Sequence, residues 1–371
     1  MIETPLTLPC GAVLPNRLCK AAMTEGLADP QGLPTPELER LYRVWGAGGA
    51  GLLLSGNVHV DADHLERPGN VIVDRPGDGA MLDAMRRWTS AAKAQGARFW
   101  AQISHAGRQT MKPVNPHPKA PSAVKLGLPG GQFGEPVALT GTEIAELVRR
   151  FAQAAAICAE GGFDGAQIHA AHGYLISQFL SPRANQRSDE WGGSLANRAR
   201  FLLEVVKATR AAVPAGFALS VKLNSADFQR GGFAFEDSLQ VAGWLEAAGV
   251  DLIEISGGTY EQPRLLGIEG MEPVEQPGIA ASTLAREAYF VYFALAMNLL
   301  LVVNISRTCR FVMNAITLHA DQLVLTLIMA FFVVHCYTTL MAEFFYDALD
   351  LPSPDPLVCE TLSTCFVYMV N

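Results

Sequence analysis

The sequence predicts an α/β fold with a parallel sheet over its first 290 residues. Short apolar runs alternate there with segments of helical periodicity, and polar residues stand where the runs end. This alternation is typical of βαβ units, whose ligands bind at the carboxyl ends of the strands. Six runs qualify as strands: residues 17–23, 51–56, 98–104, 165–170, 218–223 and 251–256.

The segment 194–212 illustrates the helices expected between these runs. Ser194 is suited to cap the first turn because its side-chain oxygen can accept a backbone N–H. Apolar residues then recur at helical spacing, which predicts an amphipathic helix with one face against the sheet. The residues expected on that face are Leu195, Ala199, Leu202, Leu203 and Val206.

Length and composition limit the function classes. The 371 residues suffice for one (β/α)8 barrel of about 250 residues with insertions, or for two smaller domains. The formal net charge of −8 argues against a nucleic-acid surface. None of the seven cysteines forms a C-x-x-C pair, which argues against a zinc or iron–sulfur cluster. The N-terminus has no basic segment before an apolar core, so we expect a cytoplasmic catalytic portion.

Charge density falls by about half near residue 290. Only eight of the 64 charged residues lie in residues 291–371. Residues 322–342 carry no charge and would span about 32 Å as a helix, enough for a bilayer core of about 30 Å. We therefore expect a hydrophobic helical tail that associates with a membrane through 322–342, with 288–306 as a weaker second span. A buried helix of a soluble protein is the alternative.

The stretch QIHAAHGYLISQF, residues 167–179, concentrates chemistry in a few positions. His169 and His172 leave a predicted strand three residues apart, and Tyr174 follows. The stretch contains no carboxylate or thiol that could complete a metal site, so no metal is predicted. Two readings stay open, because the histidines could be core residues or could aim two N–H donors at one substrate oxygen.

Longer motifs carry a family resemblance. The segment from 2 to about 290 resembles the Old Yellow Enzyme family of FMN-dependent ene-reductases. The motifs are LPNRLCKAAMTE, AQISHAGR, IHAAHGYLISQFLSPRANQRSDEWGGSLANRARFLLEVV, VKLNSADF and STLAREAYF. The resemblance implies a (β/α)8 TIM barrel in which NADPH or NADH reduces FMN, and FMN then reduces the C=C bond of an activated alkene. Such alkenes are α,β-unsaturated carbonyl or nitro compounds.

The resemblance also implies roles for the residues of that stretch. Tyr174 matches the family's proton donor, and His169 and His172 match the pair that polarises the substrate. The nicotinamide would alternate with the alkene in one pocket. Accordingly, no G-x-G-x-x-G fingerprint follows a predicted strand.

The cofactor-binding residues implied by the resemblance are Ala22, Met23, Thr24, Gly56, Gln102 and Lys222. Gln102 would bind the pyrimidine end of FMN, Lys222 would lie beside its N1 and O2, and Thr24 would lie near its O4. Many relatives have arginine at the position of Lys222, and lysine lacks the bidentate fork. The alternative for the small residues is packing at a strand end, and the alternative for Gln102 is an ordinary solvated strand end.

The resemblance to the enzyme stops near residue 290. Two further βα units, whose loops would bind the FMN phosphate, are not found, so we expect a barrel truncated after about six units. Residues from about 300 to 371 resemble the pore region of inositol-trisphosphate and ryanodine receptor calcium channels. The alternative function is therefore an ion-channel membrane fragment joined to a non-catalytic barrel remnant.

Overall fold

The computed structural model describes residues 2–262, and these lie in one compact unit. A parallel sheet forms its centre, in the order β11-β10-β9-β6-β4-β3, with β5 paired to β4. The strands of this sheet are β3 (Cys19–Lys20), β4 (Leu52–His59), β5 (Val71–Ile72), β6 (Arg98–Ser104), β9 (Gly165–Ala170), β10 (Ala218–Asn224) and β11 (Leu252–Ser256).

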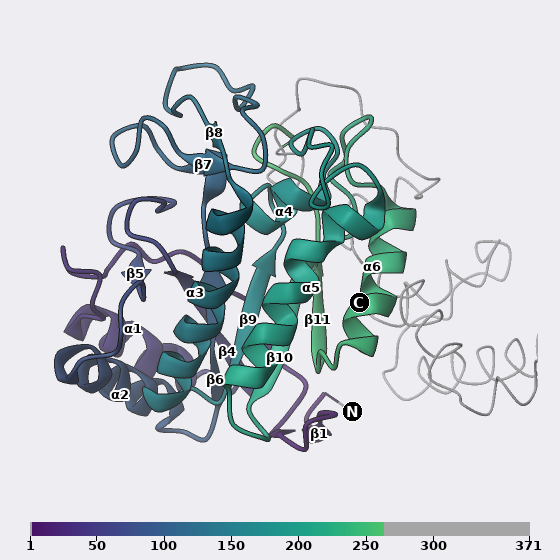
Figure 1. Ribbon diagram of the computed structural model, residues 1–371. Coiled ribbons are helices and arrows are strands. Elements are labelled where there is room, and N and C mark those ends of the chain that lie inside the picture. The colour runs from purple at the N-terminus through teal and green to yellow at the C-terminus, as the bar shows by residue number, and fades with distance from the viewer. Residues whose placement is uncertain (1, 263–371) are drawn as a thin grey trace, which may run out of the picture. The chain divides into compact units, whose positions relative to one another are not determined.

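Helices alternate with these strands along the chain. They are α1 (Pro36–Gly46), α2 (Gly79–Lys93), α3 (Gly141–Glu160), α4 (Leu175–Leu180), α5 (Leu195–Ala212) and α6 (Phe235–Ala247). Helices α3, α5 and α6 cover one face of the sheet (Figure 1). A single 3₁₀ turn, Gly107–Gln109, and the strand pair β7 (Lys119–Ala120) and β8 (Val137–Ala138) lie between β6 and α3.

The predicted α/β barrel class is confirmed by this curled parallel sheet with helices outside it. Each of the six predicted runs contains a strand of the sheet. The first run is a strand only at Cys19–Lys20, whereas the second continues three residues beyond the predicted end, to His59. Strand β4 is buried throughout, so its sequence does not alternate between polar and apolar residues. Without that alternation, the sequence alone did not show where the strand ends.

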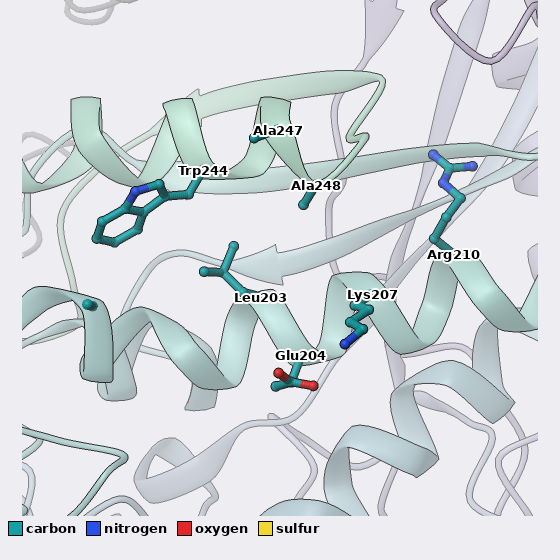
Figure 2. A pocket seen from close by; sticks show the side chains of 8 residues that line it. Leu203, Glu204, Lys207, Arg210, Trp244, Ala247 and Ala248 are labelled. Atoms are coloured by element: carbon teal, nitrogen blue, oxygen red, sulfur yellow. The ribbon is translucent and has the colours of Figure 1, made fainter.

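Local capping explains where the helices begin. Thr140 and Glu143 form a reciprocal capping box at the start of α3, and the Ser194 side chain accepts from the Asn197 amide at the start of α5. The predicted buried face of α5 was partly wrong. Phe201 is buried, whereas Leu203 is only half-buried and lines a hollow of about 520 Å³ between α5 and α6 (Figure 2).

A short hairpin of β1 (Leu6–Thr7) and β2 (Val13–Leu14) packs against the amino-terminal parts of the strands. Leu8 and Leu14 enter a core cluster with Leu52, Trp100 and Ala218, which come from β4, β6 and β10. The hairpin therefore covers the end of the sheet opposite to the carboxyl ends, and it leaves those ends for a functional site.

Several predictions for the C-terminal part lie outside the described residues. These are the missing barrel units, the weaker span 288–306, the span 322–342 and the channel-like tail. Within residues 2–262, no helix is both long enough and apolar enough to cross a membrane.

Close packing of α1 on α2 generates a test of stability. A methyl group at Gly46, the last residue of α1, would overlap the carbonyl oxygen of Ala92 in α2. We expect Gly46→Ala to lower the free energy of unfolding by about 1 to 3 kcal/mol, because backbone must move to relieve the overlap. Urea unfolding of the full chain, followed by tryptophan fluorescence, measures this difference.

Gly79→Ala is the matched control, since Gly79 starts α2 and a methyl group there meets no atom within 4 Å. We expect it to be neutral or slightly stabilising, because alanine restricts the unfolded chain. Equal unfolding midpoints for both variants would contradict the prediction, because they would show that α1 and α2 shift to accommodate the methyl group at residue 46 without loss of stability.

Candidate active site

Polar side chains gather at alternate positions near the carboxyl ends of neighbouring strands. Gln102 lies on β6, Gln167 and His169 lie on β9, and Lys222 lies on β10. All four are at least nine-tenths buried. The apolar residues between them, such as Ile168, point to the opposite face and pack under the helices. The sequence thus places a buried polar layer inside the curled sheet.

Hydrogen bonds join this layer into a continuous row. Gln102 Nε2 donates to Gln167 Oε1 at 2.6 Å, and Gln167 Nε2 donates to Ser220 Oγ at 3.0 Å and to Glu254 Oε2 at 2.9 Å. The other oxygen of Glu254 lies 2.9 Å from Lys222 Nζ. The row fixes both amides and balances the buried ammonium charge.

Lys222 and burial together set the charge state of the two predicted histidines. Burial, followed by the neighbouring His172 and Lys222, holds the pKa of His169 well below its usual value. Burial and the charge of Lys222 lower the pKa of His172 to about 3. Both imidazoles are therefore neutral near pH 7, and each carries one N–H to donate.

His172 adopts a backbone conformation that favours glycine, with φ of 60°. Its N–H donates to Asn224 Oδ1 at 3.1 Å, and its carbonyl accepts from Gln109 Nε2 at 3.1 Å. Its ring nitrogen contacts Ser256 Oγ at 2.5 Å. A non-glycine residue held in this region by bonds on both sides is characteristic of functional sites.

The three residues predicted to be catalytic lie together. The rings of His169 and His172 are 5.2 Å apart, and the ring of Tyr174 is 4.8 Å from that of His169. The Tyr174 hydroxyl lies 2.8 Å from the hydroxyl of Tyr260. Burial, with lesser effects from Tyr260 and Glu66, raises the pKa of Tyr174 well above its usual value, so the phenol keeps its proton.

Thr24 reaches the site from the segment after β3. Its hydroxyl donates to Glu66 Oε2 at 2.6 Å, and the same oxygen accepts from Asn57 Nδ2 at 2.7 Å. Its only proton is therefore directed at a carboxylate. A bond from Thr24 to the flavin O4 requires this hydroxyl to turn.

The small residues predicted to line the cofactor have different environments. A methyl group at Gly56 would overlap Glu25 and the Met23 carbonyl, and the Gly56 N–H donates to Glu25 Oε1 at 2.9 Å. The structure thus shows a packing reason for glycine at this position, and its contact with the cofactor stays a prediction. Ala22 packs against the core cluster beneath the hairpin, whereas the Met23 side chain is 54% exposed and is free to contact a bound ring.

A second polar cluster lies beside this site. Asp61, His64 and His105 have potential ligand atoms within 4.8 Å of one another. His64 Nδ1 and Arg150 Nη1 each lie 3.2 Å from Asp61 Oδ2, and His105 Nε2 lies 3.8 Å from it. The guanidinium already supplies the positive charge that a bound cation would bring.

Hydrogen bonds to the outer ring nitrogens give this cluster a structural role. The Lys119 N–H donates to His64 Nε2 at 2.8 Å, and the Gly107 N–H donates to His105 Nδ1 at 3.0 Å. In the neutral rings the protons must then sit on the inner nitrogens, which face Asp61. A metal would need lone pairs at those atoms, so the cluster is better suited to joining loops.

Comparison with known proteins agrees with this geometry. The sequence profile of the NADH:flavin oxidoreductase / NADH oxidase family matches residues 3–264. The chain belongs to this NADH:flavin oxidoreductase family. Membership assigns FMN as the cofactor and NADH or NADPH as the reductant.

Two curated relatives are named NADH-dependent flavin oxidoreductase iliE. The relative from Hypocrea jecorina is 38% identical over 307 residues, which cover 78% of this chain and 75% of the relative. The relative from Neonectria sp. is 40% identical over 310 residues, covering 79% of this chain but only 40% of the relative. This chain therefore spans less than half the length of one relative.

Solved structures of the family share the fold. Morphinone reductase in complex with tetrahydroNAD is 29% identical, with a TM-score of 0.60 over 68% of this chain and 73% of that chain. A 2-naphthoyl-CoA reductase complex is 28% identical, with a TM-score of 0.65 over 70% of this chain and 41% of that chain. These relatives lend no support to the channel-like reading of the tail.

Sequence reasoning missed several residues of the site. Gln167 and Glu254 share the alternation of His169 and Lys222, so a strict period of two would have found them. Glu66 and Tyr260 lie in loops without any periodic signal. Only the folded chain shows that they meet Thr24 and Tyr174.

The buried neutral histidines predict acid lability. Burial is the first cause that lowers the pKa of each: to about 3 for His59, about 4 for His105 and about 3 for His172, with His169 also lowered. Below about pH 6.5 the unfolded chain binds protons that the folded chain does not. Stability should therefore fall as the pH drops from 6.5 towards 4, by up to ~1.4 kcal/mol per pH unit for each histidine.

His59→Gln should reduce this slope by about one proton, as measured by urea unfolding at a series of pH values. His117→Gln is the control, because His117 is exposed. A slope that stays the same in His59→Gln would contradict the assignment of a buried neutral His59.

Proposed function

We propose that this chain is an FMN-dependent oxidoreductase that uses NADH or NADPH to reduce the C=C bond of activated alkenes. The observation that carries the proposal is the convergence of two neutral imidazoles and a buried phenol beside Lys222. When bound, FMN supplies the hydride for this chemistry. The residues of the chain would bind the cofactor, orient and polarise the substrate, and protonate it.

The polar row suits the edge of a flavin. Gln102 and Lys222 present amide and ammonium groups at the carboxyl ends, where a cofactor of this fold binds. Lys222 would lie beside N1 and O2 and favour the anionic reduced ring. Met23 would contact the ring through its exposed side chain.

His169 and His172 are placed to receive the substrate's carbonyl or nitro oxygen. Their N–H groups would stabilise the negative charge that develops on this oxygen as the β-carbon is reduced. Ser256 orients the His172 ring through its contact with a ring nitrogen. Tyr174 would then give its proton to the α-carbon, since it lies beside His169 and stays protonated at neutral pH.

The full-length chain tests this proposal directly. We expect the purified protein to bind FMN with a yellow absorbance, to be bleached by NADH or NADPH, and to regain its colour with 2-cyclohexenone or a nitroalkene. If only oxygen, and neither alkene, restores the colour of the bleached flavin, the protein is an oxidase and the ene-reductase proposal is rejected. The alternative, an ion-channel fragment, rests on residues that lie outside the described part of the chain, and no comparison supports it.

Tyr174→Phe should separate the two half-reactions. We expect oxidation of the reduced flavin by the alkene to slow by roughly 10² to 10⁴, the usual contribution of a placed general acid. Reduction of FMN by the nicotinamide should stay nearly unchanged, because the phenol acts only in the proton step. Stopped-flow traces that slow equally in both halves would remove Tyr174 from this role.

Glu254→Gln should raise the midpoint potential of bound FMN. The carboxylate of Glu254 balances the Lys222 charge at 2.9 Å, and without it the ammonium stabilises the reduced anion more strongly. Lys222→Met should lower the potential for the opposite reason. Spectroelectrochemical titration measures both shifts.

Glu204→Gln serves as the control for the potential, since Glu204 is exposed on the outer side of α5. Potentials that do not differ between Glu254→Gln and the unaltered chain would place the flavin away from the row.

A further inference from the structure

Tyr260 is a second phenol at the site. It follows β11, whereas Tyr174 stands just before α4, and their hydroxyl oxygens are 2.8 Å apart. Tyr174 is only 5% exposed, whereas Tyr260 is half-buried. One hydrogen bond therefore connects a buried proton donor to a second phenol that is partly exposed.

The loop that carries Tyr260 is held firmly. Glu261 Oε2 lies 2.6 Å from the buried Arg108 Nη2, and its other oxygen accepts from the Gly127 N–H at 2.7 Å. The ring of Phe133 contacts Tyr260 at 6.3 Å between centroids. The two contacts of Glu261 hold the loop without using the Tyr260 hydroxyl group.

Glu66 acts on both phenols. Burial is the first cause that raises the pKa of Tyr260, to about 12, and the nearby Glu66 raises it further in the same direction. Glu66 also contributes to the raised pKa of Tyr174. Both hydroxyls thus keep their protons at neutral pH, and Tyr174 in isolation would be left as a buried phenolate after each turnover.

We propose that Tyr260 is a proton-relay residue that acts through Tyr174 by returning a proton to it. This inference rests on the proposed ene-reductase function. The Tyr174 O–H bond breaks as a C–H bond forms at the α-carbon, whose electron pair comes from the enolate. The Tyr174 oxygen then takes the Tyr260 proton, which moves the negative charge from a buried to a half-buried oxygen. Tyr260 finally takes a proton from water, and the hydroxide that remains carries the charge into solvent.

Tyr260→Phe tests the relay by removing one oxygen. We expect oxidation of the reduced flavin by the alkene to slow by about tenfold, with reduction by the nicotinamide unchanged. In the double variant Tyr174→Phe, Tyr260→Phe, we expect no further slowing beyond Tyr174→Phe alone, because in the relay Tyr260 acts only through Tyr174. Additive slowing, equal slowing of both half-reactions, or no slowing would each overturn the relay.

Phe133→Leu is the matched control, since it changes packing beside Tyr260 but keeps both hydroxyls. We expect its alkene half-reaction to stay within about twofold of the unaltered chain. A slowing as large as that of Tyr260→Phe would mean that packing is responsible, and the relay would be rejected.

A second readout does not depend on alkene chemistry. In the full chain labelled with ¹³Cζ-tyrosine, we expect Tyr260→Phe to shift the Tyr174 signal and its alkaline titration, because the 2.8 Å hydrogen bond is lost. An unmoved Tyr174 signal would overturn the relay even if alkenes are reduced. A shifted signal in a chain that reduces no alkene would reject the proposed function but keep the coupling of the phenols.

Discussion

The site depends on one constraint, the parallel alignment of β6, β9, β10 and β11. Parallel pairing places equivalent residues side by side, so Lys222 lies next to His169 on one neighbour and Glu254 on the other. The hydrogen-bonded row is a direct product of that register. A shift of one residue in any strand would turn its polar side chains under the helices.

The same register explains how the site holds a buried positive charge next to two neutral histidines. A buried ammonium would be costly alone, but Glu254 balances it. Burial is the main cause that keeps the two nearby imidazoles neutral, and the charge of Lys222 adds to it. The arrangement supplies N–H donors without adding further positive charge. The backbone of His172, with its positive φ, is held by hydrogen bonds to Asn224 at the end of β10 and to Gln109 in the 3₁₀ turn.

The sequence predicted those parts of the fold and site that local patterns encode. The strands were found because buried runs alternate with amphipathic helices, and the motif with His169 and Tyr174 was found because its residues are contiguous. Glu66 contacts Thr24 across a sequence separation of 42 residues, and Tyr260 contacts Tyr174 across 86. No local sequence pattern predicts contacts between residues so far apart in the chain. Packing was already one reading of Gly56 from the sequence, but only the fold shows that Glu25 and Met23 fill the space of its missing side chain.

The hairpin at the opposite end of the sheet has a consequence for biosynthesis. The Cys10 amide donates to Asp251, 241 residues later, at the start of the last described strand. A ribosome that adds ~5 to 20 residues per second needs about 10 to 50 s to make that span. Leu8 and Leu14 stay without their partners on β10 during most of this time. The hairpin thus emerges long before β10 and β11, and its apolar side chains are available to chaperones until the sheet is made.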